Sequence, residues 1–386
     1  MASTAQTAPA GTPAQVAARP RLVGLDGIRG LAALFVVVHH CWLMSFPGYP
    51  DNTGPLWTTP LVYGHLAVVV FIVLSGFSLA VGPARASWQL GSLRRFAFRR
   101  AWRILPPYWP ALVFSLVIAW TVVPQPHSGT PTPKSVVVYG LLLQDVFGAP
   151  TPNGAFWSIA VEAQLYLVLP VLLLVLRRAG AAVMLTAVLL PVAAVGVLAP
   201  HLSIVAKLLR FTPQFAFGFA AGVVAAGVLR GDRARWPWHW LALGAAAPVL
   251  ALIAIVGPVW TVNHYFWVDL AISPAIALLL AAVATGRPRP LVGFLDSRPL
   301  RGLGSFSYSL YLIHAPIVVA VAERVVHPHL GTGVAGLLFT LAISVPLTLV
   351  LARLFAAVFE IPFTRNKSWP ALRAAIRSRN SPAPAA

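Results

Sequence analysis

The sequence predicts an all-α protein, a polytopic bundle of about ten transmembrane helices with both termini in the cytoplasm. Only 10% of the 386 residues are charged and 58% are hydrophobic, and the mean hydropathy is +0.80. A soluble domain carries roughly 25% charged residues, so this chain has too few charges to cover a surface that faces water. Most of its surface is therefore expected to face lipid.

Ten apolar runs are each long enough to cross a bilayer as a helix, which takes roughly 20 residues. These runs cover residues 24–46, 61–82, 104–123, 156–176, 181–199, 206–229, 238–258, 266–285, 303–323 and 333–358. Together they define a membrane domain over residues 21–363. Residues 1–20, rich in Ala, Pro and Thr, are expected to be a disordered cytoplasmic tail without a cleavable signal peptide. Residues 364–386 are expected to be a basic cytoplasmic tail.

The positive charges of the chain are concentrated in alternate connections between the apolar runs. The 28 Lys and Arg residues outnumber the 9 Asp and Glu residues and give a net charge of +19. With both termini in the cytoplasm, the opposite side receives only Lys134, Lys207, Arg210 and Arg324. The positive-inside rule therefore predicts a multi-pass protein of the inner (plasma) membrane. The same charges suit anionic lipid headgroups, so membrane lipids, and no nucleic acid, are expected as partners.

Residue patterns typical of metal, disulfide and nucleotide sites are sparse. Cys41 is the single cysteine, which excludes an internal disulfide and a cysteine metal cage. The histidines are scattered without a His-Glu-x-x-His arrangement, and no Walker or dinucleotide glycine pattern occurs. We therefore expect no bound metal.

The first apolar run carries ionisable side chains that are candidates for chemistry. Charged groups inside a span are costly and mark a functional site or a buried pair. Arg29 and His40 are 11 residues apart, so they share nearly one helix face and lie about 16 Å apart along the axis. A guanidinium near the cytoplasmic mouth and a deeper imidazole could line one tunnel, with Asp26 near its start. A purely structural histidine is the alternative.

The connection after the second run is dense in arginine. It contains Arg94, Arg95, Arg99, Arg100 and Arg103. One interpretation is a positive-inside anchor that lies on anionic lipid. The other is a docking site for a polyanion such as acyl-coenzyme A, because arginine binds phosphate through two hydrogen bonds. Charge alone favours the anchor.

The fourth run places Ser158 and Glu162 on one helix face, with Trp157 beside them. A carboxylate at this depth could orient an imidazole and stabilise the imidazolium that forms when the ring removes a proton. It could equally pair with an arginine for structure. Asp269 and Glu360 are further acids inside apolar runs, and the sequence assigns them no role.

The ninth run contains a polar stripe. Tyr308, Tyr311 and His314 follow one another at steps of three, so two phenols and an imidazole share a helix face and suit hydrogen bonding to a substrate. In the second run, Ser75 and Gly76 are expected to let another helix approach closely, rather than to supply a nucleophile.

Taken in order, five segments resemble the acyltransferase family 3 of bacterial membrane O-acyltransferases. The segments are Leu25–Gly30 extended through His40, Phe71–Phe77, Arg99–Tyr108, Phe156–Pro170 and Ser307–Pro316. They are similar to the family's arginine-to-histidine first helix, its "FFVLSGF" segment, its arginine-rich stretch, its "WSLSVEEQFYLLLP" segment and its "SYSLYLxHxP" segment. Ile72 and Ala163 stand where the family has a Phe and a second Glu. The second departure suggests that Glu162 alone of the acidic pair is needed.

The resemblance implies transfer of an acyl group, often acetyl, from cytosolic acyl-coenzyme A to a hydroxyl of a sugar, a surface glycan or a macrolide. By position, His40 would be the essential histidine. The supporting residues would be Arg29, Arg103, Glu162, Tyr308 and His314. Some members carry a fused extracytoplasmic domain. This sequence is expected to be the standalone form, in which a relay across the envelope would need a separate partner.

The combined prediction is an enzyme in which arginines hold the coenzyme A phosphates and His40 acts on the acceptor hydroxyl. Arg29 joins the arginines of the second connection in binding the donor, and Glu162 or Asp26 orients His40. The residues expected to bind substrate are Trp157, Ser158, Tyr308, Tyr311 and His314. General-base catalysis and an acyl-histidine intermediate both stay open. A transporter or flippase of a lipid-linked sugar is the alternative, weakened by the lack of an internal repeat, and a scaffold without chemistry is a third.

Overall fold

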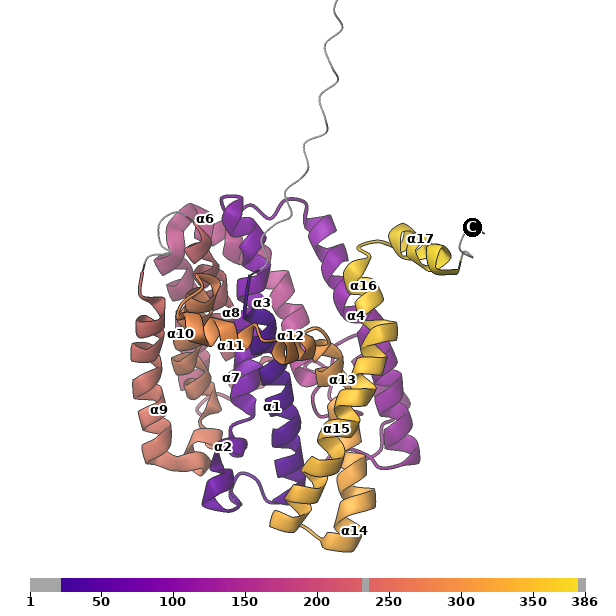
Figure 1. Ribbon diagram of the computed structural model, residues 1–386. Coiled ribbons are helices and arrows are strands. Elements are labelled where there is room, and N and C mark those ends of the chain that lie inside the picture. The colour runs from indigo at the N-terminus through magenta and orange to yellow at the C-terminus, as the bar shows by residue number, and fades with distance from the viewer. Residues whose placement is uncertain (1–21, 231–235, 381–386) are drawn as a thin grey trace, which may run out of the picture.

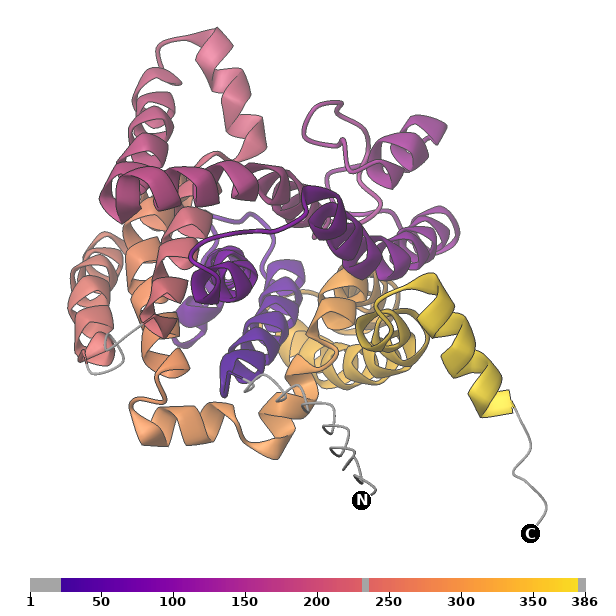
Figure 2. The ribbon, with the colours of Figure 1, turned by 90° about the horizontal axis from the view of Figure 1, so that it is seen from above.

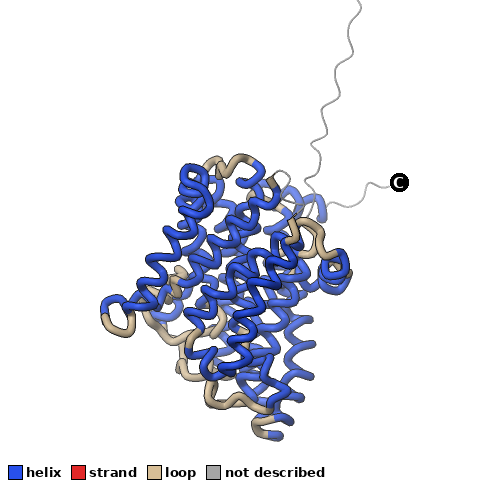
Figure 3. The backbone as a smooth tube through the Cα atoms, turned by 90° about the vertical axis from the view of Figure 1, so that its left-hand side faces the viewer, coloured by secondary structure: helices blue, strands red, loops and turns tan. Residues whose placement is uncertain are grey.

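The computed structural model of the chain describes residues 22–230 and 236–380, and these residues form helices joined by loops, without a strand (Figure 3). The predicted tail at residues 1–20 lies outside the described residues. The long helices are α1 (Leu25–Ser45), α3 (His65–Arg85), α4 (Leu93–Thr121), α6 (Trp157–Leu198), α9 (Trp238–Asn263), α10 (Tyr265–Ala284), α13 (Ser307–Val321) and α15 (Val334–Phe359).

Shorter elements connect the long helices. The short α-helices are α2 (Thr59–Val62), α5 (Pro133–Gly140), α7 (Ser203–Ala206), α8 (Gln214–Ala225), α11 (Arg289–Leu295), α12 (Arg298–Gly304), α14 (His327–Leu330), α16 (Ile361–Arg365) and α17 (Trp369–Asn380). Single turns of other helix types are η1 (Leu56–Thr58), η2 (Lys207–Phe211), η3 (Ala226–Leu229) and η5 (Ala322–Val326). Part of the predicted basic C-terminal tail is thus the helix α17.

Within the described ranges, eight helices are long and apolar enough to cross a membrane. α6 has 42 residues, or roughly 63 Å at 1.5 Å per residue, which is about twice the hydrocarbon thickness of a bilayer. Gly180 breaks α6 with φ 85° and ψ 175°, a conformation that glycine tolerates, so α6 supplies two spans. The bent pair Ser203–Phe211 and Gln214–Leu229 supplies another. The predicted fold class, an all-α polytopic membrane bundle, is confirmed.

Helices α1 and α3 lie near the centre of the bundle when it is viewed from above (Figure 2). α1 contacts α3, α12, α13 and α15, and α3 contacts α6, α8 and α10. The start of α4 and the end of α15 lie at one end of the bundle, the upper end in Figure 1. α2, which comes just before α3, lies with α14 at the opposite, lower end. The central helices therefore connect the two ends.

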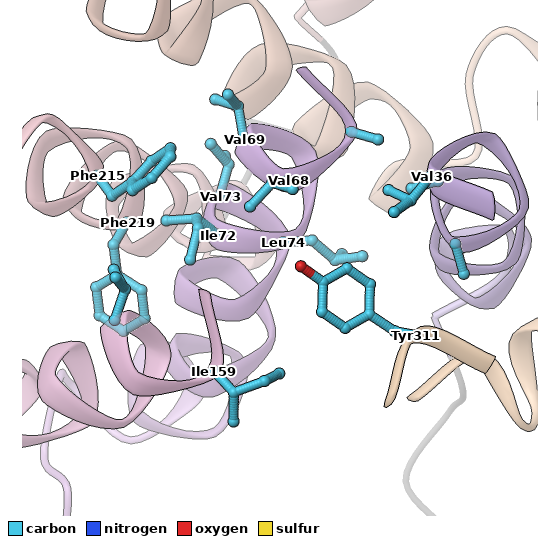
Figure 4. Close-up of a cluster of buried hydrophobic side chains, with 14 of the residues drawn as sticks. Val36, Val68, Val69, Ile72, Val73, Leu74, Ile159, Phe215, Phe219 and Tyr311 are labelled. Atoms are coloured by element: carbon cyan, nitrogen blue, oxygen red, sulfur yellow. The ribbon is translucent and has the colours of Figure 1, made fainter. Parts of the chain in front are cut away.

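Small residues bring α3 and α8 into backbone contact. A Cβ atom added at Gly76 would overlap the carbonyl oxygen of Phe219, and one added at Gly222 would overlap that of Val73. Val73 and Phe219 belong to the buried apolar cluster between these helices (Figure 4). The close helix approach predicted at Gly76 is confirmed, as the enrichment of small residues at membrane helix interfaces would suggest.

The outer helices turn apolar side chains away from the bundle. Leu250 and Ile255 of α9 and Val350 and Leu354 of α15 are exposed. Apolar surface of this extent is unfavourable in water. It is the expected surface of a helix whose solvent is lipid.

Candidate active site

A polar cavity of about 250 Å³ lies among five helices of the apolar bundle, α1, α3, α4, α6 and α13. Its polar lining comprises Arg29, Ser75, Ser78, Arg100, Arg103, Ser158, Glu162, Tyr166, Ser307, Tyr308 and Tyr311. Polar groups are costly in an apolar interior unless they have partners or a ligand. The cavity is therefore the leading candidate for an active site.

Three guanidinium groups reach this cavity from two helices. Arg29 of α1 forms an ion pair with Asp26, with 3.1 Å between Nη1 and Oδ1, and its Nη2 donates to Ser78 Oγ at 3.5 Å. Arg100 and Arg103 come from the first part of α4. In the lining itself, three guanidinium groups stand against one carboxylate, that of Glu162, so the cavity favours an anionic ligand.

Glu162 of α6 is held by two hydroxyl groups. Its Oε1 accepts hydrogen bonds from Ser75 Oγ and from Tyr166 OH, both at 2.6 Å. Hydrogen bonds to an ionised acceptor are strong ones, so the carboxylate stays fixed at the wall of the cavity. Ser75 is not among the site residues predicted from the sequence, because the adjacent Gly76 already explains this segment by helix packing.

Two histidines, from α1 and α13, lie in direct contact. The ring centroids of His40 and His314 are 4.7 Å apart, and His314 Nε2 lies 3.3 Å from His40 Nδ1. His40 Nδ1 also lies 2.9 Å from the carbonyl oxygen of Val36. His314 Nδ1 lies 2.7 Å from the carbonyl oxygen of Tyr311.

These contacts assign the tautomers of both histidines in their neutral form. A carbonyl oxygen only accepts, so each Nδ1 carries the proton and donates it. His314 Nε2 then bears a lone pair, and the Nδ1–H of His40 lies between two acceptors. His40 Nε2 is consequently unprotonated, which is the state that a general base or a nucleophile needs.

Tyr311 connects the histidine pair to the cavity. Its hydroxyl lies 2.6 Å from Ser158 Oγ, and its carbonyl oxygen accepts the hydrogen bond from His314. The side chain extends from α13 toward Leu74 of α3 (Figure 4), and both residues line the cavity. His314 is therefore bonded to a residue that lines the cavity, and His40 contacts His314.

Comparison with known proteins identifies the family to which this chain belongs. Residues 22–353 match the family model described as an acyltransferase domain. The chain belongs to this acyltransferase family. The resemblance carried by the five sequence segments is thereby confirmed.

The acyltransferase domain has relatives of differing length. YrhL of Bacillus subtilis (strain 168) is 29% identical over 332 residues, which cover 77% of this chain and 48% of YrhL. Peptidoglycan O-acetyltransferase OatA of Listeria monocytogenes is 23% identical over 389 residues, which cover 90% of this chain and 56% of OatA. Acyltransferase MdmB of Streptomyces mycarofaciens is 28% identical over 335 residues, which cover 81% of this chain and 82% of MdmB. The chain thus spans about half the length of the first two relatives. No solved structure matches it.

In the acyltransferase bundle, the predicted site residues lie in three places. Those that line the cavity are Arg29, Arg100, Arg103, Ser158, Glu162, Tyr308 and Tyr311. His40 and His314 do not line the cavity, but His314 is bonded to Tyr311 and contacts His40. Those outside the lining are Asp26, which pairs with Arg29, Trp157, and the exposed Arg94, Arg95 and Arg99.

The partner of His40 differs from the prediction. Its hydrogen bonds go to Val36 and His314, so neither Glu162 nor Asp26 is bonded to it. Asp26 precedes His40 by 14 residues on one helix, which places it about 21 Å away along the axis. Glu162 is instead held by two hydroxyl groups at the cavity wall.

A second polar cluster surrounds Asp269, an acid to which the sequence assigns no role. Asp269 of α10 is buried and pairs with His65 of α3, with 2.9 Å between Oδ2 and Nε2. The two positions are 204 residues apart and belong to no shared motif. Within the described ranges, no group of three His, Cys, Asp or Glu side chains could hold a metal ion.

Proposed function

We propose that this chain is an integral-membrane O-acyltransferase that moves an acyl group, most simply acetyl, from acyl-coenzyme A to a hydroxyl of a carbohydrate, surface glycan or macrolide-type compound. The observation that carries the proposal is an arginine-lined cavity joined to a histidine whose Nε2 is free to act as a base. Family membership supports it. So do the names of relatives, which include a peptidoglycan O-acetyltransferase and an acyltransferase.

In this proposal, Arg29, Arg100 and Arg103 bind phosphate groups of the acyl donor. Guanidinium groups bind phosphate through paired hydrogen bonds, and an apolar surrounding strengthens the attraction by lowering the dielectric constant. A cavity of about 250 Å³ suits the narrow thioester arm. The nucleotide part of the donor then remains at the mouth, where the exposed arginines at the start of α4 lie.

The proposed reaction uses His40 on the acceptor. His40 Nε2 takes the hydroxyl proton while the oxygen attacks the thioester carbonyl carbon, which contributes roughly 10²–10⁴-fold. The C–O bond forms, the C–S bond breaks, and the proton passes from His40 to the leaving thiolate. His314 accepts from the Nδ1–H of His40 and stabilises the imidazolium, and Tyr311 OH supplies a hydrogen bond to the developing oxyanion.

An acyl-histidine route fits the same arrangement. His40 Nε2 would attack the carbonyl carbon and the thiolate would leave. The acceptor oxygen would then take the acyl group as the C–N bond breaks, and its proton would pass to the thiolate. Both routes need the lone pair on Nε2 that the contacts to Val36 and His314 provide.

The proposed site of action is the inner (plasma) membrane, with the upper end of the bundle toward the cytoplasm. The arginine-rich start of α4 and the helices α16 and α17 lie at this end (Figure 1), as the positive-inside rule requires for a cytoplasmic face. Acyl-coenzyme A, a cytosolic metabolite, would then reach the arginines directly.

The test uses the purified full-length chain in lipid nanodiscs. It receives acetyl-coenzyme A labelled in the acetyl group, together with methyl β-D-glucoside, a peptidoglycan disaccharide or a macrolide. We expect release of free thiol and label on an acceptor. His40→Asn should lose both, whereas Arg177→Gln, at an exposed position outside the cavity lining, should keep them. A wild-type chain that releases no thiol with any acceptor contradicts the proposal. If the same chain in sealed vesicles instead moved unmodified glycoside across the bilayer, a flippase would be favoured.

A further inference from the structure

The residues of the cluster around Asp269 do not line the cavity that contains Arg29, Arg100 and Arg103, which is called the donor cavity below. Asp269 is fully buried, and its two carboxylate oxygens lie 3.1 and 2.9 Å from His65 Nε2. Gln214 Nε2 donates to the same Oδ2 at 3.3 Å. A buried acid within a membrane span marks a functional site or a structural pair, so the free atoms of its partners decide between the two.

Four helices begin at this cluster: α3 at His65, α6 at Trp157, α8 at Gln214 and α10 at Tyr265. The positive ends of helix dipoles stabilise a nearby carboxylate. The His65 ring stacks on Tyr265 with centroids 4.1 Å apart and lies parallel to Trp157 at 6.0 Å. The imidazole is therefore held both by its hydrogen bonds and by its ring contacts.

The carboxylate orients its two partners so that their acceptor atoms stay free. His65 and Gln214 each direct a donor nitrogen toward Asp269 Oδ2. In the neutral imidazole, His65 donates through Nε2–H, so its other ring nitrogen, Nδ1, is an acceptor, and it has no hydrogen bond within the described ranges. Gln214 is only 7% exposed, and its Oε1 is buried without a partner among the described residues. A buried acceptor without a donor is unfavourable, so the pair indicates a ligand that donates hydrogen bonds.

Charge and exposure narrow the class of ligand. A carboxylate at the centre of the cluster disfavours phosphate, so the coenzyme A donor does not fit here. A hydroxyl group fits, because it can donate to the free acceptors of His65 and Gln214, and the neighbouring aromatic rings offer apolar contact area. The His65 side chain is 19% exposed while Asp269 is fully buried, so a ligand can reach the imidazole.

The cluster is adjacent to the histidine pair of the candidate active site. A side chain at Gly64 would overlap the ring of His39. His39 and Gly64 directly precede His40 and His65 in the chain. The contact between Gly64 and the His39 ring therefore brings the segment that carries His65 next to the segment that carries His40. On the other side of the cluster, the residue that follows Trp157 lines the donor cavity.

We propose that His65 and Gln214, positioned by Asp269, form the acceptor subsite, which binds a polyhydroxylated ring such as a sugar from the lower end of the bundle. This inference rests on the proposed function. The two free acceptor atoms receive hydrogen bonds from hydroxyl groups of the ring and hold it while His40 removes a proton from another hydroxyl. His65 and Gln214 are binding residues, and Asp269 is a positioning residue.

The experiment measures donor and acceptor steps separately on the full-length chain in nanodiscs. The variants are His65→Phe, which keeps a ring for stacking, and Gln214→Leu. The matched control is His264→Phe, because His264 also stacks on an aromatic ring, Trp260, but lies outside the cluster. The readouts are the Kd of coenzyme A, thiol release from acetyl-coenzyme A without acceptor, and the acceptor KM for methyl β-D-glucoside, a peptidoglycan disaccharide and a macrolide.

We expect the acceptor KM to rise about tenfold in His65→Phe and about three- to tenfold in Gln214→Leu, since each loses a hydrogen bond to the acceptor. Coenzyme A affinity and acceptor-free thiol release should stay within about twofold of wild type, as in the control. Unchanged acceptor KM in both variants, or equal loss of coenzyme A binding in both, overturns the acceptor subsite alone. A wild-type chain that acetylates none of the three probes and releases no thiol contradicts the proposed function, and the subsite falls with it.

Discussion

Two polar clusters in this bundle differ in the sign of their charge and in the hydrogen-bonding atoms that they leave free. The cavity lined by Arg29, Arg100 and Arg103 presents cations and donors. The cluster around Asp269 presents a buried carboxylate with the free acceptor atoms of His65 and Gln214. The first suits a phosphate-bearing donor, and the second suits a hydroxyl-bearing acceptor.

The same two helices contribute to both clusters. α3 carries His65 at its first residue and Ser75 ten residues later, about 15 Å along the axis. α6 carries Trp157 at its first residue and Glu162 slightly more than one turn later. In a chain with only 10% charged residues, a few side chains thus determine which ligand each part of the bundle admits.

The largest expected effect is at the histidine pair, which both clusters share in the proposed reaction. We expect His40→Asn to lower the transfer rate about 10²–10⁴-fold, because no lone pair remains on a basic nitrogen. Coenzyme A affinity should change by less than about twofold, since the arginines are untouched. Rates come from labelled acetyl transfer and affinities from coenzyme A titration. A variant with full transfer activity would show that the histidine pair is structural.

The next largest effect concerns the affinity of the arginine-lined cavity for coenzyme A. We expect Arg100→Gln and Arg103→Gln each to weaken coenzyme A binding about 10- to 100-fold, because each loses a charged hydrogen bond to phosphate. The effect should shrink at high salt. Arg177→Gln, at an exposed position on α6, is the matched control and should bind normally. Equal losses in all three variants would mean that general positive charge, and not the cavity, holds the donor.

Substitution of the two carboxylates, Asp269 and Glu162, should have smaller effects, and these should fall on different kinetic constants. We expect Asp269→Asn to raise the acceptor KM about three- to tenfold, because His65 and Gln214 lose the charge that orients them. Glu162→Gln should instead lower the transfer rate while leaving the acceptor KM within about twofold. Steady-state kinetics at saturating acetyl-coenzyme A measure both values. If the two variants showed the same kinetic defect, the division into donor and acceptor regions would be wrong.

The smallest effect concerns the backbone contact between α3, which contributes to both clusters, and α8, which carries Gln214. Gly76→Ala should destabilise the bundle by about 1–3 kcal/mol, because the new methyl group meets the carbonyl oxygen of Phe219. Gly82→Ala on the same helix has open space, so it should stabilise α3 by about 0.5–1 kcal/mol. Thermal unfolding in one detergent compares the two variants. A stable Gly76→Ala protein would mean that α3 and α8 can move apart freely.

The sequence alone determined the class of fold and several of the polar residues that line the cavity, among them Arg29, Glu162 and Tyr311. Apolar runs of spanning length and the sparse charges specify a membrane bundle, because each run can satisfy its own backbone hydrogen bonds as a helix. The spacing of Arg29 and His40, and the stripe of Tyr308, Tyr311 and His314, follow from local helix geometry. Pattern alone was misleading where it assigned Glu162 or Asp26 to orient His40.

Only the tertiary structure decided which polar side chains become partners. Ser75 and Glu162 are 87 residues apart, His65 and Asp269 are 204 apart, and His40 and His314 are 274 apart. Helical periodicity fixes which residues share a face, but it carries no information about which two faces meet. That choice depends on how small residues such as Gly76 and Gly222 let whole helices pack. The sequence therefore supplied the chemical groups, and helix packing paired them.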